Sequence, residues 1–211
     1  MIICKKIRTI FIHIPKNAGS SITQYFKSNF LESELKHWAL SNQTKHETYF
    51  EIQKKGKNLS ILKNFFFDAS FLDFYKFAVV RNPYDRMVSL YFYLKQRHSQ
   101  NLLEKNNVDS FDEFIYLLEN SDSWIYNLYS TKLQLKYLVD ENQIVAMNYI
   151  CRFENIHQDL ATVSKQIGVN IKLPHENKSC HSSYKKYYTN NTKSIVSKYY
   201  SKDLNFLNYQ F

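Results

Sequence analysis

The chain has 211 residues, a formal net charge of +9 at pH 7 and a hydrophobic fraction of 44%. This length and apolar content predict one well-packed domain spanning residues 1–211, and they exclude a chain that is disordered throughout. Lysine and arginine are spread along the chain without a run of five or six like charges. We therefore expect an anionic ligand or substrate and no nucleic-acid partner, while a lysine-rich solvated surface would give the same composition.

The three cysteines, Cys4, Cys151 and Cys180, have no C-x-x-C spacing. The sequence therefore predicts inert thiols rather than a disulfide framework or a zinc site, and we expect no metal cofactor. The apolar stretches are too short, and too often interrupted by charged residues, for a signal peptide or a membrane anchor. We expect a soluble, cytoplasmic protein, for which peripheral association with a membrane stays open.

The first predicted strand is Arg8–Ile14 (RTIFIHI), a β-branched and aromatic run that Pro15 ends. The loop PKNAG follows, and Ser20 and Ser21 suit the start of a helix. The sequence ITQYFKSNF then places four apolar side chains on one helical face: Ile22, Tyr25, Phe26 and Phe30. Strand, loop and helix follow one another in this first segment.

A second strand, loop and helix segment comes later in the chain. Lys76–Val80 (KFAVV) is predicted to be a buried strand, the turn-like RNP ends it, and Tyr84–Gln96 is an amphipathic helix. Between the two segments, Lys45–Gly56 (KHETYFEIQKKG) predicts a helix that its final glycine ends.

Helices and a strand are also predicted in the rest of the chain. Ser110–Glu119 is predicted to be a helix, with Ser110 as its N-cap and Glu113 completing a capping box. The further predicted elements are a helical region at Trp124–Leu138, a strand within Gln143–Phe153, a helix at Asn155–Gln166 that Gly168 stops, and a final helix at Thr189–Tyr200.

Buried strands that alternate with helices predict an α/β fold with a central parallel β-sheet and helices on both faces. In such folds, ligands bind beyond the carboxyl ends of the strands. The loops after Arg8–Ile14 and after Lys76–Val80 are both expected there, and both carry cations.

The first of these loops has the residues of an anion cradle. Lys16 supplies a cation, Gly19 permits an unusual backbone conformation or a close approach, and Ser20 and Ser21 supply hydroxyls and amides at a helix start. A Walker A loop has its lysine directly after the second glycine, whereas Lys16 precedes the loop's glycine by three positions. This order disfavours magnesium-dependent nucleotide chemistry.

The second loop offers another anion site. Arg81 follows the predicted strand, Pro83 lies in the turn, and Ser89 stands eight residues after the arginine. A guanidinium group presents a planar fork to a phosphate, and a serine on the next helix completes such a pocket.

Together, FIHIPKNAGSS and FAVVRNPYDRMVSLYFY resemble the two donor-binding motifs of carbohydrate sulfotransferases of the type that includes heparan and chondroitin O-sulfotransferases. The segments RFENI, LPHENKS and YYSKDLNFLNYQF are similar to that family's later blocks, so the resemblance covers most of the chain. It implies a P-loop NTPase-like sulfotransferase fold. It also implies that 3′-phosphoadenosine 5′-phosphosulfate (PAPS) is the donor and that 3′-phosphoadenosine 5′-phosphate (PAP) is the product.

The resemblance further implies individual roles. Lys16 would contact the phosphosulfate and neutralise the departing phosphate oxygen, and Arg81 and Ser89 would hold the 3′-phosphate. The segment Asn177–Tyr188 would cover the adenine, with Tyr184 or Tyr187 near it. The main-chain amides that would hold the 5′-phosphate are those of Asn17, Ala18, Gly19, Ser20 and Ser21.

Sulfuryl transfer to a hydroxyl needs a general base, and histidine suits that role. His46 is the first candidate, because it lies between the two motifs in a segment that the resemblance places at the acceptor cleft; His37, Glu47 and Glu51 stay open as alternatives. We expect a carbohydrate or glycolipid acceptor, as in capsular or surface polysaccharide biosynthesis. The side chains available to bind and stack on it are Lys45, Lys54, Lys55, Arg97, Trp38 and Tyr49.

Two other functions remain open from the sequence. A P-loop nucleotide-dependent kinase would share the fold and would also bind its anionic ligand at a loop before a helix, but it needs magnesium and a Walker lysine. A catalytically inactive module that binds nucleotides or polyanions would keep the pocket, but it would not need Lys16.

Overall fold

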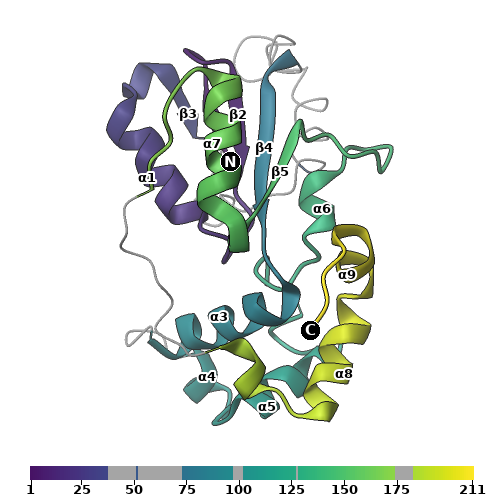
Figure 1. Cartoon of the computed structure of the whole chain (residues 1–211). Helices are drawn as coiled ribbons and strands as arrows, with labels where there is room; N and C mark the ends of the chain where they lie inside the picture. Colours follow the sequence, from purple (N-terminus) through teal and green to yellow (C-terminus); the bar gives the residue numbers. More distant parts are fainter. Residues whose placement is uncertain (38–50, 52–72, 97–101, 127, 174–182) are drawn as a thin grey trace, which may run out of the picture. The chain divides into compact units, whose positions relative to one another are not determined.

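A computed structural model describes residues 1–37, 51, 73–96, 102–126, 128–173 and 183–211 (Figure 1). The chain divides into two compact units, each formed from two stretches of sequence. The first unit consists of Met1–Val80 and Gln134–Asn177, and the second of Arg81–Leu133 and Lys178–Phe211. We describe each unit by itself.

The first unit contains a five-stranded sheet with the order β3-β1-β2-β4-β5. Its strands are β1 (Ile2–Cys4), β2 (Thr9–Ile12), β3 (Leu35–His37), β4 (Tyr75–Val80) and β5 (Tyr149–Arg152). The predicted strands at Arg8–Ile14, Lys76–Val80 and Gln143–Phe153 are thus confirmed as β2, β4 and β5, with shorter bounds for the first and the last.

The sheet is mixed, and the prediction of a parallel sheet was wrong for one edge. Strands β2, β4 and β5 are parallel, whereas β1 is antiparallel to both β2 and β3. The connection from β1 to β2 is a tight turn in which the Arg8 amide donates to the Lys5 carbonyl at 3.2 Å. So short a connection joins antiparallel strands only, because a parallel crossover needs a dozen or more residues.

Two helices cover one face of this sheet (Figure 1), α1 (Gly19–Asn29) and α7 (Ile156–Ile167). Their buried side chains, such as Phe26 and Leu160, form one cluster with the strand residues Phe11, Phe77 and Cys151. Because side chains alternate along a strand, the intervening residues face the opposite side, and Ile10, Ile12, Ala78 and Val80 are buried there as well. Burial on both faces is typical of strands in a parallel arrangement.

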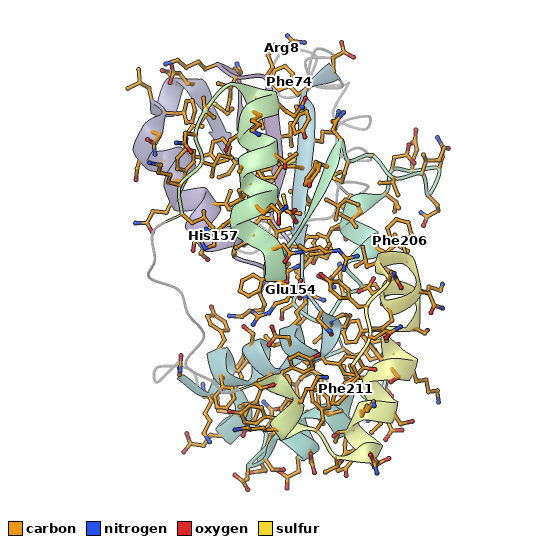
Figure 2. The ribbon with its side chains drawn as sticks, in the orientation of Figure 1. Arg8, Phe74, Glu154, His157, Phe206 and Phe211 are labelled. Atoms are coloured by element: carbon orange, nitrogen blue, oxygen red, sulfur yellow. The ribbon has the colours of Figure 1, made fainter. Side chains whose placement is uncertain are left out.

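Three further elements of the first unit with both ends in the described residues are short: η1 (Glu32–Glu34), α6 (Leu135–Leu138) and η5 (Phe153–Asn155). Helix α7 ends where Gly168 adopts a left-handed conformation with φ of 71°, as the sequence predicted. At the start of β4, the Arg8 guanidinium lies 4.9 Å from the centre of the Phe74 ring, and Figure 2 labels both residues.

In the described part of the second unit, the regular elements are helices, and turns or irregular segments join them. The helices are α3 (Pro83–Gln96), α4 (Leu102–Lys105), α5 (Phe111–Tyr116), η4 (Leu117–Glu119), η6 (Tyr184–Tyr187), α8 (Asn190–Tyr199) and α9 (Ser201–Leu207). Their core combines aliphatic and aromatic side chains, including Met87, Phe114, Val196 and Tyr200. The second unit therefore has an apolar core of its own.

One predicted capping box and one predicted helix can be checked in this unit. Ser110 Oγ accepts from the Glu113 amide at 3.2 Å while Glu113 Oε2 accepts from the Ser110 amide at 3.1 Å, so the capping box of α5 is confirmed. The predicted helix at Thr189–Tyr200 is confirmed as α8, and the Thr189 side chain caps its start by accepting from the Thr192 amide.

The predicted helix at Trp124–Leu138 was wrong apart from α6. Turns occupy most of the described part of this stretch. Thr131 Oγ1 donates to the Ile125 carbonyl at 2.5 Å and to the Leu128 carbonyl at 2.9 Å. Such local bonds compete with the helical pattern.

The predicted helix at Lys45–Gly56 lies outside the described residues, except for Glu51, which is helical. None of the helices in the described ranges is long and apolar enough to cross a membrane.

Candidate functional site

The loop between β2 and α1 has an unusual backbone. Lys16 and Ala18 both adopt positive φ angles, 70° and 59°, and Gly19 then begins α1. A left-handed conformation costs a residue that has a Cβ atom roughly 1–2 kcal/mol. Left-handed residues in turns direct successive main-chain N–H groups into a common concavity, which is the geometry of an anion-binding nest. The strain is thus located at the lysine and the alanine, and not at the glycine.

Gly19 is needed for a different reason. A Cβ atom added at this position would overlap the His13 imidazole ring. That ring is stacked on Phe11, with 6.0 Å between the ring centroids and 29° between the planes. The sequence allowed two roles for Gly19, an unusual backbone conformation or a close approach of another group. The structure supports the close approach, and the group that approaches is the His13 side chain.

The first turn of α1 carries no negative charge of its own. It contains no acidic residue, and within the described part of the chain no side chain caps the helix, whose N-cap is Ala18. The aligned peptide dipoles give this end a partial positive charge. Together with the Lys16 cation two residues before the N-cap, the helix end provides an electrostatic environment that favours an anion.

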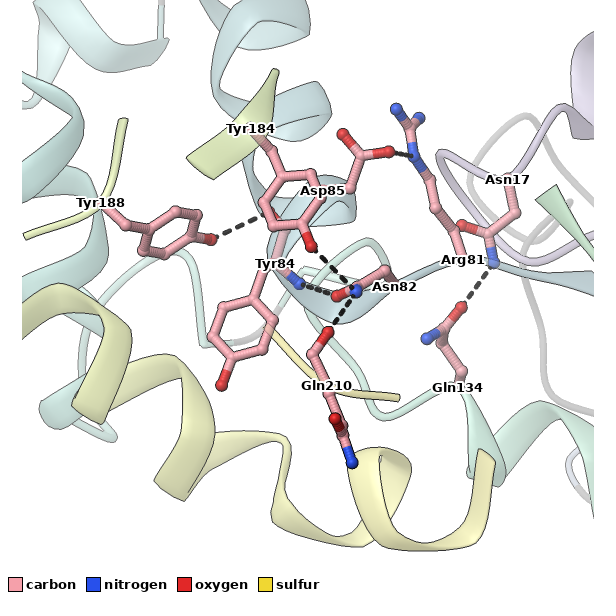
Figure 3. Close-up of polar contacts among 9 residues, drawn as sticks. All are labelled: Asn17, Arg81, Asn82, Tyr84, Asp85, Gln134, Tyr184, Tyr188 and Gln210. Carbon is pink, nitrogen blue, oxygen red and sulfur yellow. Dashed lines mark hydrogen bonds and ion pairs between the residues drawn. The ribbon is translucent and has the colours of Figure 1, made fainter. Parts of the chain in front are cut away.

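The Asn17 side chain attaches this loop to its surroundings (Figure 3). Its Nδ2 donates to the Val79 carbonyl near the end of β4, at 2.9 Å, and to Gln134 Oε1 at 2.7 Å. Asn17 and Gln134 are both buried, at 1% and 0% exposure. A buried amide pair with good geometry holds its segments rigidly, because separating the two groups would leave them without partners.

Gln134 is a residue that sequence reasoning missed. It precedes α6 and is 117 positions from Asn17 in the chain. Nothing in the local sequence marks a glutamine as buried, so no signal available from one sequence could have identified it. Its contact with Asn17 attaches the loop to the segment that precedes α6.

In the second unit, helix α3 begins directly after the turn that follows β4, and the residues Arg81, Asn82 and Pro83 explain why it begins there. Asn82 is the N-cap of α3, because its Oδ1 accepts from the Tyr84 amide at 3.1 Å and its carbonyl accepts from the Arg86 amide at 2.9 Å. Pro83 occupies the first helical position, where its missing N–H group is not needed.

Arg81 directly precedes this cap and is held by the same helix. Its Nε forms an ion pair with Asp85 Oδ2 at 2.7 Å, and only 4% of the arginine side chain is exposed (Figure 3). The pair fixes the plane of the guanidinium group. Ser89 lies on α3 as well and is buried, and its hydroxyl group forms no hydrogen bond to the described residues.

Arg86 and Asp203 belong to the core of the second unit. Both side chains are fully buried, and Arg86 Nη1 donates to the Lys132 carbonyl at 3.0 Å. Burial raises the pKa of the neighbouring Tyr199, the positive charge of Arg86 opposes that rise, and Asp203 adds to it. Full burial and these interactions are typical of structural residues.

The other predicted site residues lie in different places. Tyr187 packs edge-on against Phe92 at 5.2 Å and against Phe111 at 6.1 Å, which are core contacts. His37 is the last residue of β3. Several residues predicted for the acceptor side lie outside the described residues: Trp38, Lys45, His46, Glu47, Tyr49, Lys54, Lys55 and Arg97.

The two described cysteines have the character of core residues. Cys4 and Cys151 are fully buried and unpaired with each other. Burial raises the pKa of the Cys4 thiol, and it raises the pKa of Cys151 to about 12. Both thiols are therefore protonated at neutral pH, which confirms the prediction that they are inert.

Comparison with known proteins bears on this geometry. The family model of the sulfotransferase family matches residues 1–210 of this chain. An uncharacterized protein of Archaeoglobus fulgidus is 32% identical over 97 residues, which are 46% of this chain and 70% of that protein. No solved structure gives a significant match. Because the family match covers residues 1–210 of the 211 in the chain, the chain belongs to the sulfotransferase family.

Proposed function

We propose that the protein transfers a sulfuryl group from PAPS to a hydroxyl group of a carbohydrate, either a surface or capsular glycan or a glycolipid. The observation that carries this proposal is the loop from Pro15 to Ser21, found in a chain that belongs to the sulfotransferase family. In this loop, a lysine with a left-handed backbone precedes a helix end that has neither an acidic residue in its first turn nor a side-chain cap from the described residues.

Lys16 has two roles in the proposal. In the ground state, its ammonium group binds the phosphosulfate bridge. During transfer, it neutralises the charge that develops on the departing phosphate oxygen, which stabilises the transition state more than the ground state. The 5′-phosphate is bound by the main-chain amides of residues 17–21, where the helix dipole adds to the attraction.

Arg81 and Ser89 are proposed to bind the 3′-phosphate, the group that distinguishes PAPS from other adenine nucleotides. Three features of the turn support this role. Asn82 caps α3, Asp85 orients the arginine through Nε, and the serine is on the same helix. Tyr187 is proposed to contact the adenine with a part of its ring that does not face Phe92 and Phe111.

The reaction is an in-line displacement at sulfur. The acceptor hydroxyl oxygen forms a bond to sulfur while the bond between sulfur and the 5′-phosphate oxygen breaks, and the electron pair of that bond leaves with PAP. The hydroxyl proton goes to a general base, for which we propose His46, with His37, Glu47 and Glu51 as alternatives. We also propose that β2, the Lys16 loop and α1 form a P-loop-like element beside the parallel strand β4.

The 3′-phosphate provides the direct test. Isothermal titration calorimetry should show that PAP binds the wild-type protein at least about tenfold more tightly than AMP, since charge-assisted hydrogen bonds to an additional phosphate contribute about 1.5–3 kcal/mol. Equal affinities would contradict the assignment of Arg81 and Ser89.

Turnover is tested with radiolabelled sulfate and a panel of glycan and glycolipid fractions. Lys16→Ala should abolish transfer without changing the melting temperature by more than a few degrees, because the side chain acts on the leaving group. Exposed Lys27, on α1, gives the matched control Lys27→Ala, which should transfer at the wild-type rate. Retained turnover in Lys16→Ala would exclude its proposed role in the reaction.

A further inference from the structure

Asn82 is the centre of a hydrogen-bond arrangement that the donor motif alone does not explain. Its Oδ1 caps α3, while its Nδ2 donates to the Gln210 carbonyl at 2.8 Å and to the Tyr184 hydroxyl at 3.3 Å (Figure 3). Both hydrogens of the amide therefore have acceptors from residues more than 100 positions later in the chain. The residue next to Arg81 is thus attached to two distant segments of the second unit.

Phe211 holds one of these segments in place. Its ring meets three tyrosine rings edge-on, with centroid distances of 4.9 Å to Tyr84, 5.8 Å to Tyr184 and 5.5 Å to Tyr188. Edge-to-face contacts at these distances are favourable, and they restrict the position of every ring involved. The main chain at Gln210 is fixed as a consequence, because its neighbour occupies this aromatic cluster.

Two lysine side chains contact Phe211 in this aromatic cluster. Lys193 Nζ lies 4.2 Å from the centre of the Phe211 ring, and Lys185 Nζ donates to the main-chain oxygen of Phe211 at 3.2 Å. Cation–π attraction and a charge-assisted hydrogen bond therefore oppose the departure of this segment.

Hydrogen bonds also hold the first turn of α3, to which Tyr84 belongs. The Tyr188 hydroxyl donates to the Tyr84 carbonyl at 2.9 Å, and the Tyr84 hydroxyl lies 2.6 Å from Ser197 Oγ on α8. Burial raises the pKa of Tyr188 well above its usual value, so the hydroxyl stays a donor at all physiological pH values. The start of α3 is therefore held through both its cap and its first turn.

We propose that Phe211 and Gln210, acting through Asn82, position Arg81 for the 3′-phosphate, so that the last two residues of this chain set the selectivity for the donor. The inference rests on the proposed function. Asn82 and Phe211 are positioning residues in this scheme, because they act on the guanidinium group through the main chain of the turn. A purely structural role for them would affect stability without affecting the discrimination between PAP and AMP.

Titration calorimetry of PAP and AMP, performed well below the melting temperature of each variant, tests the proposal. Phe211→Ala should weaken PAP binding about tenfold, equivalent to about 1.4 kcal/mol, and should leave AMP binding unchanged. Phe211→Leu, which refills much of the volume, should recover part of the loss. The matched control is Phe206→Ala on α9, where the ring is 46% exposed and makes no ring contact with the described residues, and Figure 2 labels both phenylalanines.

A second variant addresses the hydrogen bonds directly. Asn82→Ser keeps a side-chain oxygen for the Tyr84 amide but loses the donors to Gln210 and Tyr184, so it should reduce the ratio of PAP to AMP affinity as Phe211→Ala does. This variant also supports or overturns the proposal if Phe211→Ala does not fold.

The outcomes separate the two claims. A wild-type protein that does not prefer PAP over AMP would contradict the proposed function itself. A wild-type protein with that preference, together with folded Phe211→Ala and Asn82→Ser variants that keep it in full, would overturn the positioning role alone.

Discussion

At the scale of single residues, the loop from Pro15 to Ser21 depends on conformations and contacts that its sequence indicates only in part. Lys16 and Arg81 could be predicted as cation positions because each follows a strand and precedes a helix. The contact of Asn17 with Gln134 could not be predicted, since it joins residues 117 positions apart through an ordinary amide pair. The left-handed conformation of Ala18 could not be predicted either, because the glycine at position 19 is the residue for which such a conformation would be expected.

The contact between Gly19 and His13 gives a prediction at this scale. Gly19→Ala should destabilise the protein by about 1–3 kcal/mol, the usual cost of inserting a methyl group into a filled site. His13→Ala opens the space that the new Cβ needs, so the double variant should recover most of that loss. Urea denaturation of all four proteins gives the interaction free energy as a double-mutant cycle. Additive changes would mean that the ring and the new methyl group do not collide.

At the scale of elements, periodicity and capping signals predicted β2, β4, α1, α3, α7 and α8. Strand β1 was not predicted because it has only three residues, which are too few for a periodic pattern. The antiparallel edge of the sheet depends on that strand, so the error in topology follows from the missed element. The false helix at Trp124–Leu138 has a different origin, because the Thr131 hydroxyl bonds to carbonyls of its own segment.

The capping box of α5 gives a prediction at this scale. Hydrogen bonds from the Asp109 and Ser110 amides lower the pKa of Glu113. A carboxyl with a lowered pKa in the folded state stabilises the protein above its unfolded pKa of about 4.3, and this stabilisation is lost as the pH falls through the folded pKa. Glu113→Gln should therefore be less stable than wild type at pH 7, and the difference should shrink as the pH falls below about 4.3.

Melting temperatures measured from pH 7 to pH 3 check this expectation. Glu119→Gln, which removes the charge of an exposed glutamate in η4, controls for the change in net charge. A constant difference between Glu113→Gln and wild type across this range would show that the carboxylate form is not the stabilising one.

At the scale of the whole molecule, the two proposed donor motifs belong to different compact units. Lys16 and its loop are part of the first unit, and Arg81 and Ser89 are part of the second. The match to the sulfotransferase family extends over both. That the chain is a single domain, as its length and composition indicate, stays a prediction.

If both proposed motifs bind the donor, PAP should protect the main-chain amides of each motif from hydrogen exchange. We expect slower exchange in peptides that cover residues 14–22 and 81–89 when PAP is added. AMP, which lacks the 3′-phosphate, should protect the first peptide alone. Mass spectrometry of the exchanged protein measures both, and protection by PAP confined to one unit would contradict the assignment of the other motif.

The close packing of His13 on Gly19 also has an evolutionary consequence. Because the imidazole occupies the space where a side chain at position 19 would begin, the two positions are not free to change independently. A relative that carries alanine or a larger residue in place of the glycine should also carry a smaller residue in place of the histidine. The pair should therefore co-vary among homologous sequences, even in relatives that act on different acceptors.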